Sequence, residues 1–162
     1  MISPFHLAWP DSIQNLKSIL MDKHIINILM VSDDECDFRN LETEFRQNKV
    51  INPLSLVFQA SDSPEIIKDK IVANMSTATP TVILLDISLP DMNGLKILKS
   101  LMEEQKVTNT RIFIVTSSSE VKEEIEKARF NIAGYIEKPV SFPKFASAIS
   151  QLKSSWQYYE AN

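Results

Sequence analysis

Residues 81–94 have the sequence Thr-Val-Ile-Leu-Leu-Asp-Ile-Ser-Leu-Pro-Asp-Met-Asn-Gly, and this stretch decides the fold. Its first five residues are mostly branched and apolar, which is typical of a central parallel strand buried on both faces of a sheet. The run ends at one carboxylate, Asp86, and Pro90, Asn93 and Gly94 predict a turn soon afterwards. Open α/β sheets bind their ligands at the carboxyl ends of their strands, so Asp86 is our candidate for the chemistry. The alternative is that Asp86 only shapes the loop as an Asx-turn residue.

Four more apolar segments flank this strand, and amphipathic segments alternate with them. Strands are predicted over 25–31, 54–60, 81–86, 111–116 and 134–138, and helices over about 35–48, 64–72, 94–102, 118–128 and 141–158. Helix-start patterns support the boundaries: Asp34 as N-cap, Ser63-Pro64 with proline at the first helical position, and Ser117 with Glu120 as a capping box. Five repeats of strand then helix predict an α/β fold, in which helices cover both faces of a five-stranded parallel sheet.

The composition is that of an ordinary globular domain. The chain has 162 residues, 44% of them hydrophobic and 23% charged, with a net charge of −4. The mild acidic excess, without a dense Lys/Arg block, argues against a nucleic-acid surface. No apolar run is long enough to cross a membrane, and the first residues lack a signal-peptide pattern. A single cysteine, Cys36, excludes an internal disulfide and suits a reducing compartment, so we expect a cytoplasmic protein.

Residues 1–20 differ from the rest of the chain and are expected to form an N-terminal extension. Asp11 and Gln14 resemble a capping box, and the apolar residues that follow fall on one helical face, so the extension is either a short amphipathic helix or a frayed terminus. Residues 21–158 would form the single domain and residues 159–162 a short tail.

Polar side chains end four of the predicted strands. Ser32 and Asp33 follow the first, Asp86 the third, Thr116 the fourth and Lys138 the fifth. The carboxyl ends of parallel strands share one edge of a sheet, so these groups should meet in one crevice. Crowded carboxylates stay ionised only beside positive charge, and Mg²⁺ prefers oxygen ligands of this kind. A carboxylate nucleophile, a metal, an ammonium and a hydroxyl together suit phosphoryl transfer.

These residues carry a resemblance to a known family. From about residue 25 to residue 152 the chain resembles the receiver domain of two-component response regulators, and it looks like the single-domain class. The matching motifs are Asp33 after the first strand, Leu-Leu-Asp-Ile-Ser-Leu-Pro-Asp-Met-Asn-Gly at 84–94, Ile-Val-Thr-Ser at 114–117 and Gly-Tyr-Ile-Glu-Lys-Pro at 134–139. Each motif is weak alone, but their order and their places on the strand ends make the set specific. The resemblance implies a flavodoxin-like three-layer sandwich.

The resemblance also implies a role for each strand-end residue. Asp86 would be the phosphoacceptor and would attack a phosphohistidine on a histidine kinase or phosphotransfer protein. Asp33, Asp86 and the backbone carbonyl of Ser88 would bind Mg²⁺. Thr116 and Lys138 would each contact a phosphoryl oxygen. Such a domain is not an enzyme with a separate substrate, because it catalyses only its own phosphorylation and dephosphorylation.

Signal output would use a second region of the chain. Tyr135 matches the switch aromatic of the family, which turns inward as Thr116 moves toward the phosphoryl group. A downstream protein would bind the face made by the fourth helix, fifth strand and fifth helix, and homodimerisation is left open. The Lys138–Pro139 peptide bond is expected to be cis.

One position departs from the family pattern. The family usually has two acidic residues after the first strand, and here the first position is Ser32. Sliding the strand by one residue would restore a pair, Asp33-Asp34, but would also exchange the faces of the strand. We favour Ser32-Asp33 with Asp34 as helix cap, and therefore expect weaker Mg²⁺ affinity. The alternative function is a phosphorylation-independent interaction module, and a metal-dependent phosphatase ranks last because Ser88 stands where that chemistry needs a second acid.

Overall fold

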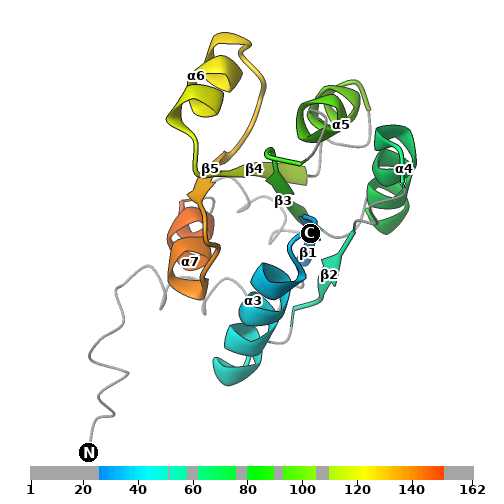
Figure 1. Ribbon diagram of the computed structural model, residues 1–162. Helices are drawn as coiled ribbons and strands as arrows, with labels where there is room; N and C mark the ends of the chain where they lie inside the picture. Colours follow the sequence, from blue (N-terminus) through cyan, green and yellow to red (C-terminus); the bar gives the residue numbers. More distant parts are fainter. Residues whose placement is uncertain are drawn as a thin grey trace, which may run out of the picture.

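The computed structural model of the protein describes residues 26–50, 52–57, 62–75, 80–89, 93–104 and 110–151. One sheet runs through the described part of the chain. It has five parallel strands in the order β2-β1-β3-β4-β5 (Figure 1). The strands are β1 (Asn27–Val31), β2 (Leu54–Leu56), β3 (Thr81–Asp86), β4 (Thr110–Thr116) and β5 (Gly134–Glu137). The predicted parallel α/β fold is confirmed.

Helices connect the strands and cover both faces of the sheet (Figure 1). They are α3 (Glu35–Gln47), α4 (Pro64–Asn74), α5 (Asn93–Met102), α6 (Ser119–Lys127) and α7 (Phe142–Ser150). The predicted caps Asp34 and Ser63 are confirmed, since the side chain of each accepts a hydrogen bond from an amide of the first turn.

The predicted cap of α6 is wrong by one residue. Its N-cap is Ser118, whose hydroxyl accepts a hydrogen bond from the Val121 amide at 3.2 Å, and not Ser117. The reason lies in the preceding residue: the Thr116 hydroxyl accepts a hydrogen bond from the Ser118 amide at 3.0 Å. That turn uses Ser117 as a connecting residue and moves the helix start one position along the chain.

The fifth strand and the last helix have different bounds in the structure from those that the sequence predicted. The fifth strand ends at Glu137, so Lys138 lies in the loop that follows it. The last helix begins at Phe142 behind the N-cap Ser141, and within the described residues it ends at Ser150 with Gln151 as C-cap. The N-terminal extension and the C-terminal tail lie outside the described residues.

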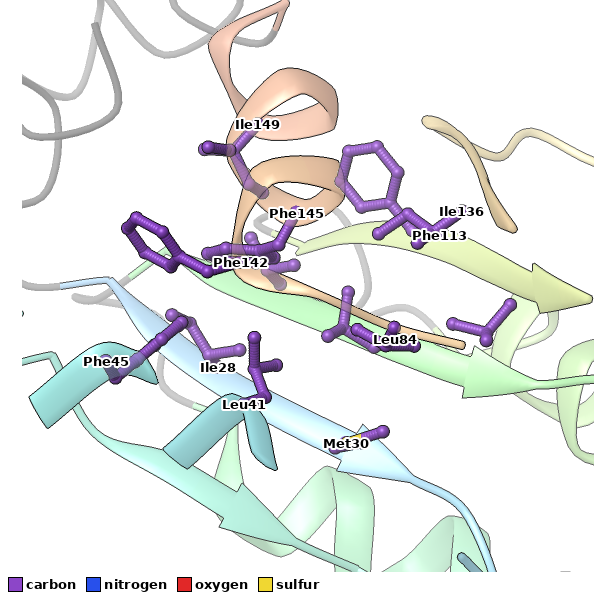
Figure 2. Close-up of a cluster of buried hydrophobic side chains, with 14 of the residues drawn as sticks. Ile28, Met30, Leu41, Phe45, Leu84, Phe113, Ile136, Phe142, Phe145 and Ile149 are labelled. Carbon is purple, nitrogen blue, oxygen red and sulfur yellow. The ribbon is translucent and has the colours of Figure 1, made fainter. Parts of the chain in front are cut away.

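Two apolar layers hold the helices on the sheet, because alternate residues of each central strand point to opposite faces. Ile28, Met30 and Leu84 point toward α3 and α7, where they pack with aromatic side chains (Figure 2). Those aromatics are Phe45 of α3 with Phe142 and Phe145 of α7, and the ring centroids of Phe45 and Phe145 are 5.3 Å apart. Leu29, Val31, Ile83 and Leu85 point to the other face and pack with α4, α5 and α6. Both faces of β3 are fully buried, as the apolar run predicted.

Gly94 serves a purpose that differs from the predicted turn. It lies in the first turn of α5, which packs directly against the backbone that follows β3. A Cβ atom at this position would lie 2.7 Å from both the Cα and the carbonyl oxygen of Ile87. Glycine is therefore required for the close approach of α5 to the turn that carries Asp86.

No helix in the described ranges is both long enough and apolar enough to cross a membrane.

Candidate functional site

Asp86 is the centre of the candidate site. It is the last residue of β3, and its side chain is only 2% exposed. Its Oδ1 atom accepts hydrogen bonds from the Ser88 amide at 2.9 Å and from the Ser88 hydroxyl at 2.6 Å. The bond to the Ser88 amide is an Asx-type turn, so Asp86 does shape its loop. Its Oδ2 atom contacts side chains from two other parts of the sheet edge, Ser32 and Lys138, so Asp86 does more than shape the turn.

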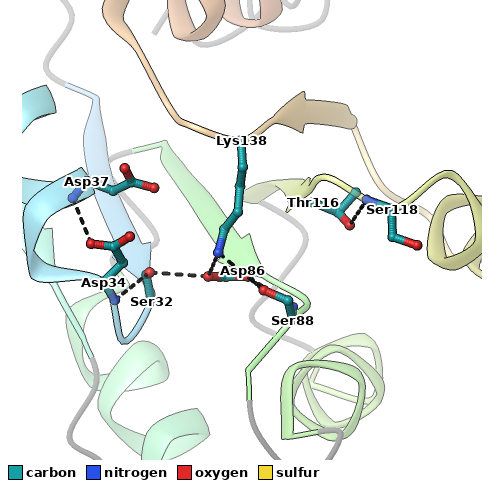
Figure 3. Close-up of polar contacts among 8 residues, drawn as sticks. All are labelled: Ser32, Asp34, Asp37, Asp86, Ser88, Thr116, Ser118 and Lys138. Atoms are coloured by element: carbon teal, nitrogen blue, oxygen red, sulfur yellow. Dashed lines mark hydrogen bonds and ion pairs between the residues drawn. The ribbon is translucent and has the colours of Figure 1, made fainter.

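Lys138 reaches Asp86 from the loop after β5. Its Nζ atom lies 2.6 Å from Oδ2 of Asp86 and donates a hydrogen bond to the Ser88 hydroxyl at 3.2 Å (Figure 3). Burial alone would lower the pKa of Lys138, but the hydrogen bond and negative charge of Asp86, with the charges of Asp37 and Asp33, raise it above its usual value. The ammonium is therefore a fixed positive charge at the carboxylate.

Ser32 contributes a contact that the sequence did not predict. Its hydroxyl donates a hydrogen bond to Oδ2 of Asp86 at 3.3 Å and accepts one from the Asp34 amide at 3.0 Å. Val31 pairs with Leu85 in the sheet, which places Ser32 beside Asp86 at the next position. The predicted register is thus confirmed, and the neutral side chain at the first position is part of the site.

Asp33 follows Ser32 and is exposed to solvent. It is the next residue after Ser32, whose hydroxyl bonds to Asp86, so it lies at the same edge of the sheet as Asp86. Among the described residues, no three side chains of the His, Cys, Asp or Glu types come close enough to hold a metal by themselves. Mg²⁺ usually keeps several waters and takes only one or two carboxylates, so the oxygen atoms of Asp33 and Asp86 fit this ion.

Thr116 lies at the end of β4 with its hydroxyl directed to the Ser118 amide, away from Asp86 (Figure 3). Thr116 ends its strand as the sequence predicted, but its hydroxyl accepts a hydrogen bond within the turn that follows the strand. The hydroxyl only accepts that bond and keeps its own proton, so its predicted contact with a phosphoryl oxygen would require it to turn toward Asp86 (Figure 3). The role of Thr116 stays a prediction.

Tyr135 lies on β5 and contacts α6. Its hydroxyl donates a hydrogen bond to the Lys122 carbonyl at 3.4 Å, and the Lys122 ammonium lies 4.9 Å from the centre of its ring. Burial and the nearby Glu126 carboxylate raise the pKa of Tyr135. The ring therefore links β5 to the helix that begins just after Thr116, which is a suitable position for the predicted switch.

Two features of the site were missed by the sequence analysis. The first is the Ser88 side chain, since only its backbone carbonyl was predicted to take part. The second is Asp37 of α3, which is 8% exposed and lies close enough to Lys138 and Asp86 for their charges to affect it. Burial is the main cause of its raised pKa, and the Asp34 carboxylate adds to it. Its position four residues before Leu41 and eight before Phe45, on the buried stripe of α3, could have revealed it.

The comparisons with known proteins agree with this geometry. The family model of the response regulator receiver domain matches residues 28–150. Polar-differentiation response regulator DivK of Brucella ovis is 31% identical over 70 residues, which are 43% of this chain and 57% of that protein. The same values hold for DivK of Brucella suis. The chain thus spans less than two thirds of the length of these relatives.

Solved structures show the same fold. The bacteriophytochrome response regulator RtBRR is 26% identical with a TM-score of 0.63, over 79% of this chain and 78% of that chain. A two-component response regulator from Legionella pneumophila is 25% identical with a TM-score of 0.60, over 80% of this chain and 98% of that chain. The five-stranded parallel sheet, the strand-end site and the match over most of the chain lead to one conclusion: this chain belongs to the response regulator receiver domain family.

Proposed function

We propose that this receiver domain accepts a phosphoryl group on Asp86 from a phosphohistidine, carried by a histidine kinase or a phosphotransfer protein, and that phosphorylation changes which partner it binds. The observation that carries the proposal is the contact of 2.6 Å between the Lys138 ammonium and Oδ2 of Asp86. A lysine that only bordered a surface turn would not lie against a carboxylate that is 2% exposed.

The transfer is a displacement at phosphorus. One carboxylate oxygen of Asp86 forms a bond to phosphorus while the bond from phosphorus to the histidine nitrogen breaks, and the imidazole leaves with the electron pair of that bond. The product is an acyl phosphate on Asp86. Transfers of this kind depend on positioning and on neutralising the phosphoryl oxygens, and Lys138 supplies a positive charge at the required place.

Ser88 and Ser32 orient the nucleophile. The two Ser88 donors hold Oδ1, while Ser32 and Lys138 hold Oδ2, so both oxygens of Asp86 have defined directions before a donor arrives. An oriented carboxylate loses less entropy in the transfer than a mobile one. The domain thereby promotes its own phosphorylation and has no separate substrate.

Mg²⁺ is the proposed cofactor, held by Asp33, Asp86 and the backbone carbonyl of Ser88. When bound, it neutralises negative charge on the phosphoryl oxygens and on the two carboxylates. Support comes from the oxygen-only donor set and from the exposure of Asp33, which leaves room for the waters that Mg²⁺ retains. Ser32 adds no charge, so the affinity should be lower than with a second acid at its position.

The proposed output surface is formed by α6, β5 and α7. Phosphorylation would draw the Thr116 hydroxyl from the Ser118 amide toward the phosphoryl group, and Tyr135 would lose its position against α6. The hydrogen bond from the Ser118 amide to the Thr116 hydroxyl supports this route, because a movement of that hydroxyl toward Asp86 would break a contact with the N-cap residue of α6. A downstream protein would then distinguish the two arrangements.

Incubation with acetyl phosphate and Mg²⁺, followed by intact-mass measurement, tests the proposal. Wild type should gain one phosphoryl group, and Asp86→Asn should gain none. The matched control is Asp69→Asn, which makes the same chemical change on the exposed surface of α4 and should behave as wild type. Equal labelling of wild type and Asp86→Asn would refute the proposal.

The alternative is an interaction module that does not depend on phosphorylation. The observation that favours it is the neutral Ser32 at a position where the family usually has an acid. It predicts no adduct on wild type and the same partner affinity for wild type and Asp86→Asn. Pull-down of the partner with both proteins, before and after acetyl phosphate treatment, separates the two functions.

A further inference from the structure

Ser32 brings a buried hydroxyl to the carboxylate of Asp86. It is 2% exposed and follows β1, the strand that pairs directly with β3. Its oxygen lies 3.3 Å from Oδ2 of Asp86 and 3.0 Å from the amide nitrogen of Asp34 (Figure 3). An amide can only donate, so the hydroxyl accepts from Asp34 and donates its one proton to Oδ2. The backbone thus directs this proton at the oxygen that the Lys138 ammonium also contacts.

The two oxygens of Asp86 are held by donors of different kinds. Oδ1 accepts from the Ser88 amide at 2.9 Å, and that amide is fixed in the Asx-type turn. Among the described residues, the donors to Oδ2 are both side chains, the Ser32 hydroxyl and the Lys138 ammonium, and side chains can turn with the atoms that they bind. Oδ2 is therefore the oxygen that can form a new bond while the turn stays intact. A group attached to Oδ2 would lie against both of these donors.

The other hydroxyls of the site do not reach Oδ2 of Asp86. The Thr116 hydroxyl accepts from the Ser118 amide and points away from the carboxylate (Figure 3). The Ser88 hydroxyl donates to Oδ1 at 2.6 Å. At 3.3 Å, the bond from Ser32 to Oδ2 is longer than most bonds between two oxygen atoms. Hydrogen bonds in active sites often shorten only when the reacting group is bound, so this hydroxyl is free to move to a closer acceptor.

We propose that Oδ2 is the attacking oxygen of Asp86 and that Ser32 is a catalytic residue, whose hydroxyl donates a hydrogen bond to the phosphoryl group during transfer. The inference rests on the function proposed above. As the bond from Oδ2 to phosphorus forms, the bond from phosphorus to the histidine nitrogen breaks, and the imidazole keeps the electron pair of that bond. The carbonyl double bond of the acyl phosphate is then at Oδ1. The Ser32 proton stays on its own oxygen and changes only its acceptor, from Oδ2 to a phosphoryl oxygen.

Serine also changes what position 32 offers to the reaction. The family usually has an acid there, and an ionised carboxylate can only accept hydrogen bonds. Ser32 supplies a donor and adds no negative charge. A donor stabilises the charge that is spread over the phosphoryl oxygens during transfer, whereas a second carboxylate needs a metal to offset its own charge. The residue that should weaken Mg²⁺ binding therefore assists the transfer itself.

The first test measures the rate of labelling by acetyl phosphate at saturating Mg²⁺, read by intact mass. Ser32→Ala removes the donor and should lower the rate roughly tenfold. Ser32→Cys keeps nearly the same size with a weaker donor, so its rate should fall between those of wild type and Ser32→Ala. Ser63→Ala is the matched control, because it also removes a hydroxyl that accepts an amide hydrogen bond at the start of a helix, and its rate should stay within about twofold of wild type. Urea unfolding verifies that each variant is folded.

A second measurement reports the contact and not the rate. Beryllofluoride binds a carboxylate, in the presence of Mg²⁺, as an analogue of the phosphoryl group, with fluorine atoms in place of the phosphoryl oxygens. In the fluorine NMR spectrum of the bound analogue, one resonance should shift in Ser32→Ala, and none should shift in Ser63→Ala. A hydroxyl that only orients the free carboxylate of Asp86 would leave every fluorine resonance unchanged.

The outcomes separate this inference from the proposed function. Wild type that gains no phosphoryl group overturns both. Wild type that is labelled while Ser32→Ala keeps the wild-type rate overturns the role of Ser32 alone. A rate loss in Ser32→Ala that disappears as the Mg²⁺ concentration is raised also overturns it, because the hydroxyl would then act through the metal. Unshifted fluorine resonances in Ser32→Ala overturn it as well, since the hydroxyl would not contact the phosphoryl group.

Discussion

Substitution of Gly94 by alanine should displace the backbone of Asp86 and Ile87, which carries the candidate site. The added Cβ would lie 2.7 Å from the Cα and carbonyl oxygen of Ile87 and 2.8 Å from the carbonyl oxygen of Asp86. Ordinary contacts begin near 3.4 Å, so the two segments must separate by about 0.7 Å, the difference between 3.4 and 2.7 Å. All three atoms belong to the main chain and cannot rotate away. Either α5 or the turn that carries Asp86 must therefore move.

The cost can be estimated from two opposing effects. Overpacking of a closely packed region costs about 1–3 kcal/mol, and the upper end applies here because rigid backbone is displaced. Alanine gains up to about 1 kcal/mol over glycine in a helix interior. The net loss in the free energy of unfolding for Gly94→Ala is therefore about 2 kcal/mol, equivalent to a fall in Tm of roughly 4–8 °C for a domain of this size.

Urea unfolding of wild type and Gly94→Ala measures this loss, and acetyl phosphate labelling measures its effect on Asp86, which should slow. The chain has one other glycine, Gly134 in β5, and it provides the control. A Cβ there would meet only the side chain of Phe113, at 3.3 Å, so Gly134→Ala should stay within about 1 kcal/mol of wild type. A Gly94→Ala protein as stable as wild type, or less affected than Gly134→Ala, would refute the reasoning.

Three further predictions concern the strand-end residues. Folding raises the pKa of Lys138, so the ion pair with Asp86 contributes stability that is complete below about pH 10 and is lost as the pH rises through the folded-state pKa. Between about pH 9 and pH 11, the free energy of unfolding in urea should therefore fall more for wild type than for Lys138→Met. Equal losses would contradict this. Thr116→Val leaves the Ser118 amide without its acceptor and should cost about 1 kcal/mol in urea unfolding, whereas Thr116→Ser, which keeps the hydroxyl, should match wild type. Ser32→Asp adds a carboxylate beside Asp86 and should tighten Mg²⁺ binding in calorimetry while lowering stability without Mg²⁺ through like-charge repulsion; an unchanged Mg²⁺ affinity would show that position 32 does not face the metal.

The parallel sheet and most of its elements could be predicted from the sequence, because they depend on local patterns. The run before Asp86 is apolar on both faces, and β3 is buried on both faces. Asp34 and Ser63 cap helices through bonds to amides only three residues away. The alternation of strands and helices predicted that Asp86 and Lys138 would lie at the same edge of the sheet, because parallel strands place their carboxyl ends on one edge.

Tertiary structure alone decided which groups touch. Whether Thr116 faces the site or the Ser118 amide depends on a competition between hydrogen bonds, and the nearer amide is the partner in this structure. The spacing of Asp37 from Leu41 and Phe45 places it on the buried stripe of α3, but only the packing of that helix in the folded protein brings its carboxylate to the same end of the sheet as Lys138 (Figure 3). Gly94 looked like a turn residue, and only the close approach of α5 to Ile87 showed its purpose. A pattern of residue types records which face of an element is apolar, whereas contacts between distant elements depend on how those faces pack.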